Sequence, residues 1–197
     1  LEIAFVGAED RHFRPRPGES RPFTAVFVGK LVPLHGLETI LAAARLAPEV
    51  PFTVVGEGQL ARLLATAPTN VTHVPWLDYD ELPSLYSGAG CALGIFGTGE
   101  KAARVIPNKA FQAIACAAPL ITADTPAARE LLTHETDALL VPAGDPTALA
   151  RAVRRLAADG ALAARIGAGG RETYVARASE AVLAKTWHAI FERALTR

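Results

Sequence analysis

The sequence predicts an α/β fold, a three-layer α/β/α sandwich built on a parallel sheet of about six strands. Short runs rich in Val, Ile, Phe and Thr alternate with longer helical patterns from Phe23 to about Asp145, which is the rhythm of repeated βαβ units. The runs are almost uniformly apolar, as expected for strands covered by helices on both faces. The chain has 197 residues, of which 50% are hydrophobic, enough for one domain with a sizeable core.

The individual elements follow from this alternation in chain order. Strands are predicted over residues 22–29, 51–56, 70–76, 90–97, 119–123 and 137–142. Helices are predicted between them over 36–47, 59–66, 79–89, 107–118 and 125–133, with two or three more in 145–197. We expect Asp145, which precedes a proline, and Ser179 to be N-caps, and Gly160 to separate two helices.

We expect three regions along the chain. Residues 1–22 are interpreted as a leading strand or extended segment followed by an interdomain linker, because 9–23 is polar, rich in Pro and Arg, and without periodicity. Residues 23–177 form the predicted α/β domain, and residues 178–197 a C-terminal helix. The chain contains no methionine and opens on the apolar run LEIAFVG, so we expect it to be a piece of a longer polypeptide.

Composition argues against several classes of protein. Lys plus Arg equals Asp plus Glu, at 20 each, so nothing in the overall charge favours nucleic acid or an anionic membrane surface. No apolar stretch approaches the ~20 residues needed to cross a bilayer, and we expect a soluble, cytoplasmic protein. Cys91 and Cys116 lie far apart in apolar surroundings, which predicts buried thiols rather than a disulfide or a metal site.

Two motifs point to cofactors and are interpreted structurally. FTVVGEGQLA, residues 52–61, with Asp78 further on, matches the dinucleotide-binding fingerprint. It follows the second strand instead of the first and precedes a short helix, so we interpret Gly56 and Gly58 as a tight turn, with nicotinamide binding as the alternative. The DYD sequence ending at Asp80 matches a metal-binding Asp-x-Asp. We interpret Asp80 as a helix N-cap and expect no metal site.

The turn after the first predicted strand has the composition of an anion site. Gly29 allows a sharp turn, Lys30 places a cation at the carboxyl edge of the sheet, and His35 precedes the next helix. A solvated loop with a stray lysine is the alternative for this turn taken alone.

The turn after the fourth predicted strand strengthens the anion interpretation. Lys101, Arg104 and Lys109 gather positive charge there, and Pro107 suits the first position of a helix whose free amides would face a ligand. The first and fourth strands are neighbours across the switch point of a doubly wound sheet. A negatively charged ligand between the two turns is therefore expected.

Segments along nearly the whole chain match one family pattern in register. They include GAEDRHFRP, FVGKLVPLHGLETILAAARL, NVTHVPWLDYDELPSLYSGAGCALGIF, NKAFQAIACAAPLITADTPAARELL and DALLVPAGDPTALARAV. Through them the chain resembles the nucleotide-sugar-binding C-terminal domain of retaining GT-B glycosyltransferases of family 4 (glycosyl transferases group 1). The resemblance implies a Rossmann-like domain that forms one half of a GT-B fold.

The resemblance implies site residues. Lys30 and His35 would be the catalytic cations on the donor diphosphate, backbone amides over 105–108 would bind the same phosphates, and residues 75–77 would border the nucleobase. The implied donor-binding residues are Gly29, Lys30, His35, Trp76, Leu77, Glu100, Arg104, Val105, Ile106, Asn108, Lys109 and Gln112.

Two departures from the family pattern matter. The usual paired acids would fall at Arg104 and Gln112. Gln112 can still hydrogen-bond ribose hydroxyls, whereas Arg104 cannot accept bonds from sugar hydroxyls, so either Glu100 takes that role or the sugar is held differently. His35 stands in place of a lysine, and we expect it to be only partly charged near neutrality.

The resulting functional hypothesis is the donor half of a glycosyltransferase of polysaccharide or glycolipid biosynthesis, which acts without a metal or other cofactor. Its partners would be the nucleotide-sugar donor and its own N-terminal acceptor-binding domain, through which any membrane contact would be made. Residues 178–197 would pack towards that domain, leaving Trp187, Ile190 or Phe191 partly exposed in this chain. The alternatives are a sugar-nucleotide epimerase or hydrolase on the same framework, and a nucleotide-sugar-binding module without transferase activity.

Overall fold

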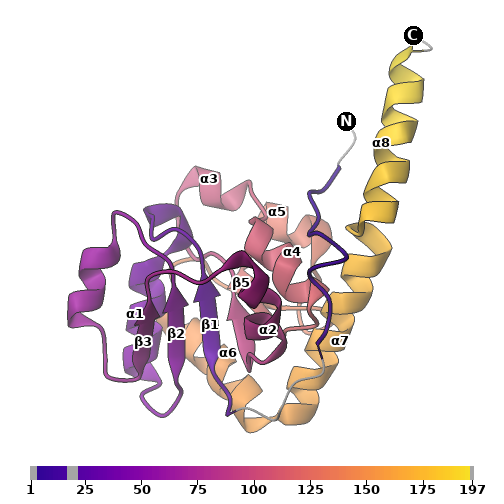
Figure 1. Cartoon of the computed structure of the whole chain (residues 1–197). Helices are drawn as coiled ribbons and strands as arrows, with labels where there is room; N and C mark the ends of the chain where they lie inside the picture. Colours follow the sequence, from indigo (N-terminus) through magenta and orange to yellow (C-terminus); the bar gives the residue numbers. More distant parts are fainter. Residues whose placement is uncertain (1–3, 17–21, 196–197) are drawn as a thin grey trace.

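A computed structural model describes residues 4–16 and 22–195 of the chain. Its centre is a six-stranded parallel sheet with the strand order β3-β2-β1-β4-β5-β6 (Figure 1). All six strands predicted from the sequence are confirmed, and most are shorter at their ends than the apolar runs that predicted them. The strands are β1 (Ala25–Val28), β2 (Phe52–Val55), β3 (Val71–Val74), β4 (Cys91–Leu93), β5 (Leu120–Ala123) and β6 (Leu139–Val141).

The order of the strands brings the turns after β1 and β4 together. Ala25 pairs with Phe52 of β2 on one side and with Cys91 of β4 on the other, all in parallel register. From β1 the chain continues outward to β2 and β3, and from β4 it continues outward the other way to β5 and β6. The connections that follow β1 and β4 therefore leave in opposite directions, which is the switch point at which doubly wound sheets bind ligands.

Helices and short 3₁₀ turns connect the strands. The α-helices are α1 (Leu37–Leu46), α2 (Leu82–Ser87), α3 (Glu100–Ala103), α4 (Asn108–Ala115), α5 (Pro126–Leu131), α6 (Pro146–Ala158), α7 (Gly160–Arg177) and α8 (Glu180–Leu195). The 3₁₀ turns are η1 (Pro33–His35), η2 (Ala61–Thr66) and η3 (Tyr79–Glu81). The helix expected over 59–66 is thus a 3₁₀ turn, and the sequence predicted neither η1 nor α3.

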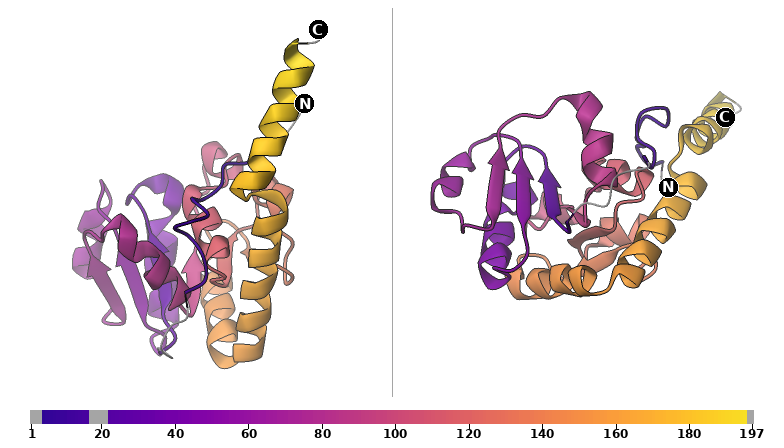
Figure 2. Two further views of the ribbon diagram at one scale, coloured as in Figure 1. Left: turned by 45° about the vertical axis from the view of Figure 1, so that its right-hand side comes forward. Right: turned by 60° about the horizontal axis from the view of Figure 1, so that its bottom comes forward.

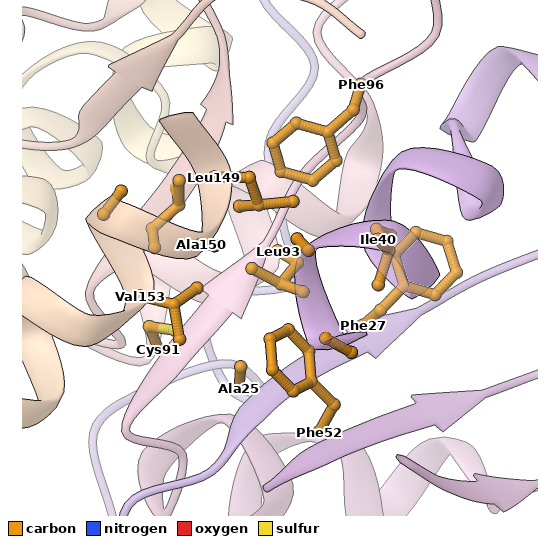
Figure 3. Packing of buried hydrophobic residues seen from close by; sticks show 14 of the residues in the cluster. Ala25, Phe27, Ile40, Phe52, Cys91, Leu93, Phe96, Leu149, Ala150 and Val153 are labelled. Atoms are coloured by element: carbon orange, nitrogen blue, oxygen red, sulfur yellow. The ribbon is translucent and has the colours of Figure 1, made fainter. Parts of the chain in front are cut away.

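Helices lie on both faces of the sheet (Figure 2), and apolar side chains form a buried cluster on each face. On one face, α1 and α6 pack over Phe27, Phe52 and Leu93, and Figure 3 shows Ile40 and Val153 pointing into this cluster. On the other face, α2, α4 and the later part of α7 form a second cluster. Burial of one such large apolar side chain contributes roughly 1.5–3 kcal/mol to the stability of the folded state. Cys91 and Cys116 are buried free thiols, as predicted.

The cap predictions met different outcomes. Asp145 is confirmed as the N-cap of α6, since its Oδ1 accepts hydrogen bonds from the amides of Thr147 and Ala148, both at 2.9 Å. Ser179 directly precedes α8, and its carbonyl accepts from the amide of Leu183 (2.9 Å), but its side chain does not cap the helix because its hydroxyl donates to the carbonyl of Val175 (2.9 Å). The amide of Glu180 bonds instead to the carboxylate of Asp10 (3.1 Å).

Asp80 is not an N-cap either. It lies within η3, and its carboxylate is 3.7 Å from Nε2 of His12. Asp78 occupies the cap position of η3, but its side chain makes no capping hydrogen bond there. Asp78 accepts a hydrogen bond from Nε1 of Trp76 instead (3.2 Å).

Residues 4–16, called the N-terminal segment from this point on, form no strand in the part of the chain that the structure describes. They run along the domain beside α2 and the start of α8 (Figures 1 and 2). The Phe13 side chain is fully buried. The amide of Ala8 donates to the hydroxyl of Tyr174 (3.2 Å), which in turn donates to Oδ1 of Asp10 (2.6 Å). The segment expected to be a linker is therefore anchored on the domain.

Helix α8 extends away from the sheet and its covering helices (Figure 1). The rings of Trp187 and Phe191 stack at 5.9 Å between centroids and are 46% and 61% exposed, while Ile190 is half-buried. What α8 packs against in a longer protein stays a prediction. Among the described residues, we find no helix with the length and apolar character that a membrane span requires.

Candidate functional site

The turns after β1 and β4 are in direct backbone contact with each other. Gly36 has φ 71°, and a Cβ added to it would lie 2.6 Å from the carbonyl carbon of Phe96. The amide of Phe96 donates to the carbonyl of His35 (3.1 Å). Only glycine fits this close approach of the two backbones, so the sequence at Gly36 fixes how the two turns meet.

Lys109, the second residue of α4, places its amine where the two turns meet. Its side chain is only 8% exposed, and Nζ has no hydrogen-bond partner among the described residues. Nζ lies 3.7 Å from the centroid of the Phe27 ring, a cation–π distance. A Cβ added to Gly29 would be 2.7 Å from Nζ and 3.4 Å from Cε1 of His35, so the two basic side chains converge over Gly29.

This burial decides the protonation of both groups. Burial holds the pKa of Lys109 well below its ordinary value, because the charged amine is separated from water. Burial, and then the charge of Lys109, lower the pKa of His35 to about 4. The expectation that His35 is partly charged near neutrality is therefore wrong for the ligand-free protein.

The hydrogen bond of His35 also fixes its tautomer. Nδ1 contacts the backbone carbonyl of Lys30. A carbonyl only accepts hydrogen bonds, so Nδ1 carries the proton and Nε2 of the neutral ring is an acceptor. The Lys30 side chain on the same turn is exposed.

The N-terminus of α4 adds backbone donors to this edge. Pro107 stands at the N-cap, one residue earlier than expected, and makes no side-chain capping bond. The first amides of a helix have no intrahelical acceptor and carry partial positive charge. Val105 and Ile106 lie half-buried in the preceding loop, Asn108 is exposed, and Gln112, one turn after Lys109, is half-buried.

Glu100 and Arg104 do not join the buried cluster. They form an ion pair with each other at 3.3 Å, and their side chains are 86% and 75% exposed. Exposed pairs of this kind contribute little to stability. The structure therefore keeps Glu100 with Arg104 at the surface of the α3 region.

A pocket of about 380 Å³ opens next to Gly29 at the carboxyl ends of β1, β2 and β3. It is mainly apolar, and its lining joins the first turn to the segment after β3. The sequence indicated residues 29–30 and 75–77 of this lining but missed Glu57 and Tyr79. Their positions after β2 and β3, the strands next to β1 in the sheet, are the signal that could have identified them. The lining includes Gly29, Lys30, Glu57, Trp76, Leu77 and Tyr79.

The structural interpretation of Gly56 and Gly58 is confirmed. A Cβ at Gly56 would lie 2.2 Å from the carbonyl oxygen of Gly29, and one at Gly58 would lie 2.6 Å from that of Leu31. The amide of Gly56 is bonded to the carbonyl of Val74 (2.9 Å). The turn at Gly56 and Gly58 therefore packs closely against the backbone of the first βα turn. The Gly56 amide is not free to bind a ligand, because it is hydrogen-bonded to the Val74 carbonyl.

A metal site at Asp78 and Asp80 is the alternative to the interpretation of Asp80 as an N-cap. Within residues 4–16 and 22–195, no group of three or more His, Cys, Asp or Glu side chains is placed to hold a metal ion.

Comparison with known proteins identifies the family. Residues 22–159 match the family described as glycosyl transferases group 1. The chain belongs to this family. It is 28% identical over 178 residues to the lipopolysaccharide core biosynthesis glycosyltransferase LpsD of Rhizobium meliloti (strain 1021), a match that covers 89% of the chain and 51% of LpsD.

Solved structures show the same fold for this member of the glycosyl transferases group 1 family. Sucrose-phosphate synthase from Thermosynechococcus elongatus superposes with a TM-score of 0.83 at 24% identity, covering 97% of the chain and 52% of the synthase. Anabaena HepE, solved with UDP-glucose, gives a TM-score of 0.84 at 16% identity over 98% of the chain and 57% of HepE. The chain thus spans about half the length of these relatives and forms one Rossmann-like half of a GT-B fold.

Lys109→Met should stabilise the ligand-free protein. Methionine keeps the unbranched stem and removes the amine, so the free energy of unfolding should rise by about 1–3 kcal/mol, the usual cost of a buried polar group without a partner. Urea denaturation at pH 7 measures this change. The gain should shrink as pH rises towards the ordinary lysine pKa of about 10.4, because the unfolded parent then binds fewer protons at this position.

Lys101→Met, at an exposed position of α3, is the matched control and should change the free energy of unfolding by less than about 0.5 kcal/mol. A Lys109→Met protein that is less stable than the parent would show that the amine is not an unfavourable buried group.

Proposed function

We propose that this chain is the donor-binding half of a retaining glycosyltransferase, which transfers a sugar from a nucleoside-diphosphate sugar to an acceptor. The observation that carries the proposal is the Lys109 amine, which is buried without a hydrogen-bond partner among the described residues and converges with His35 over Gly29. A nearby anion stabilises the charged form of such an amine. Membership of the glycosyl transferases group 1 family favours the diphosphate of a nucleotide sugar as that anion.

In the proposed complex the diphosphate lies over Gly29, against Lys30, His35, Lys109 and the first amides of α4. Transfer breaks the bond between the anomeric carbon and the phosphate oxygen, so negative charge develops on the departing diphosphate. Positive groups fixed at that position stabilise the transition state more than the ground state. This electrostatic route needs no metal ion or other cofactor, and we assign no nucleophile or general base to this chain.

The rest of the donor is assigned to neighbouring surfaces. The mainly apolar pocket beside Gly29 suits a nucleobase bordered by Trp76 and Leu77. Gln112 would bond to ribose hydroxyls through its amide. The HepE structure, which was solved with UDP-glucose, supports UDP as the first nucleotide to test.

The acceptor side is proposed to belong to a second domain of a longer protein. The exposed ring pair of Trp187 and Phe191 on α8 offers an apolar face for that domain, which would also make any contact with a membrane on the cytoplasmic side. We expect this chain alone to bind donor without transferring sugar, because one wall of the active site would be supplied by the other domain.

One observation favours a second candidate, a nucleotide-sugar-binding module without transferase activity. Arg104 stands where the family pattern has an acid, and Glu100 is paired with it at the surface. Incubating the full-length parent with a panel of nucleotide sugars separates the possibilities, since transfer, isomerisation and binding alone correspond to a transferase, an epimerase and a binding module.

The chain should bind UDP, or another nucleoside diphosphate, through the edge formed by β1 and β4. Lys30→Ala should raise the dissociation constant about tenfold or more, because a charged hydrogen bond contributes about 1.5–3 kcal/mol. Gln112→Ala should raise it about fivefold, as expected for a neutral hydrogen bond of about 1 kcal/mol. Isothermal titration calorimetry with UDP, GDP and ADP measures these constants.

Lys185→Ala, on an exposed position of α8, serves as the control and should leave affinity unchanged. Binding should also survive a chelator. Unchanged affinity for UDP in both site variants would rule out the proposed site. UDP binding that strictly requires magnesium or manganese and is lost in Asp78→Asn would restore the metal interpretation.

His35→Lys should bind UDP more tightly than the parent at pH 8. A bound diphosphate raises the pKa of His35 from about 4, so its charge contributes fully below pH 4 and is lost as pH rises through the bound-state pKa. Lysine at this position would keep its charge to a higher pH. The dissociation constant of the parent divided by that of His35→Lys should therefore fall towards one as pH falls from 8 to 5.

Taking the ratio cancels the ionisation of UDP itself. Each unit by which binding raises the pKa of His35 corresponds to about tenfold in affinity at low pH. Parallel pH profiles for the two proteins would mean that His35 does not touch the diphosphate.

A further inference from the structure

We propose that His12 in the N-terminal segment is a positioning residue for base recognition, because it holds Tyr79 in the wall of the pocket beside Gly29. The inference rests on the proposed function, in which this pocket takes the nucleobase. It adds a specificity element from a part of the chain that lies outside the α/β domain proper.

The contact between His12 and Tyr79 involves both ring and backbone. The two rings stack with 4.6 Å between centroids and 2° between planes. Nε2 of His12 is 3.0 Å from the backbone carbonyl of Tyr79, to which it donates. Phe13 adds an edge-to-face contact with the same ring at 5.4 Å. His12 thus contacts both the Tyr79 side chain and its peptide unit, and Phe13 supports the ring from its edge.

Tyr79 needs such support because its own element is small. It lies in η3, a 3₁₀ turn of three residues, which has weaker hydrogen-bond geometry than an α-helix. Tyr79 itself is 48% exposed, and Trp76, which precedes it in the pocket wall, is 79% exposed. Burial alone therefore does not hold the Tyr79 ring, and the stack on His12 supplies a fixed surface for it.

The N-terminal segment is rigid enough to act as that surface. Phe13 is fully buried, and Asp10 is bonded to the hydroxyl of Tyr174 (2.6 Å) and to the amide of Glu180 (3.1 Å). On the other side of His12, the amide of Arg16 donates to the hydroxyl of Ser87 on α2 (3.1 Å). The segment is fixed to the domain before and after the residue that contacts Tyr79.

This arrangement separates base recognition from phosphate binding. Tyr79 lines the pocket, whereas Lys109 and His35 meet over Gly29. An aromatic ring in a fixed position favours stacking on a base, and a ring free to move contributes less because ordering it on binding costs entropy. Loss of His12 should therefore weaken binding of the base and leave binding of phosphates unchanged.

The test compares UDP with inorganic pyrophosphate as probes of the intact chain. His12→Ala should raise the dissociation constant of UDP about fivefold to tenfold, as expected for a weakened aromatic stack on the base, and leave that of pyrophosphate within about twofold, both measured by calorimetry. Arg14→Ala, at an exposed position of the same segment, is the matched control and should change neither. Equal weakening of both ligands, or no weakening of UDP, would overturn the inference.

A double-mutant cycle tests whether His12 acts through Tyr79. In a Tyr79→Ala background, His12→Ala should cost little further UDP affinity, whereas additive losses would overturn the proposal. If His12→Ala does not fold, His12→Leu, which fills a similar volume but loses both the ring stack and the hydrogen bond to the Tyr79 carbonyl, enters the same comparisons with the same two outcomes. A parent chain that binds neither UDP nor pyrophosphate would instead refute the proposed function.

Discussion

The close contact between the turns after β1 and β4 is the constraint on which the site depends. Gly36 lets the first turn approach the backbone of Phe96, and the amide of Phe96 bonds to the carbonyl of His35. Because β1 and β4 are neighbours in the sheet, this contact places α4 beside the first turn and Lys109 over Gly29. The basic groups are therefore positioned by the backbone before any ligand is bound.

That arrangement is unfavourable for the ligand-free protein and favourable for an anion. A buried amine without a partner lowers stability, and burial together with its charge lowers the pKa of His35 to about 4. A diphosphate in the proposed position would reverse both effects, because it supplies the counter-charge that the protein does not. The proposed catalytic role depends on the same property, since groups fixed before the reaction need no rearrangement as charge develops on the leaving group.

The sequence predicted the sheet well because its strands are short, nearly uniform apolar runs, and the Asp145 cap because it depends only on the next three residues. It failed where a distant segment decides the outcome. The capping bond at the start of α8, predicted for Ser179, is made by Asp10 of the N-terminal segment. Asp80, also predicted to be an N-cap, lies close to His12 of the same segment. The neutral state of His35 could not be predicted from the sequence either, because it results from burial and from the charge of Lys109, which is remote in sequence.

Proton uptake on ligand binding would show whether the buried Lys109 amine receives the diphosphate. Calorimetric titration of UDP at pH 8 in two buffers of different ionisation enthalpy gives the number of protons bound with the nucleotide. We predict that the parent takes up more protons than Lys109→Met, because the diphosphate raises the pKa of Lys109 that burial lowers. Binding without proton uptake, or equal uptake by both proteins, would contradict this role for the amine.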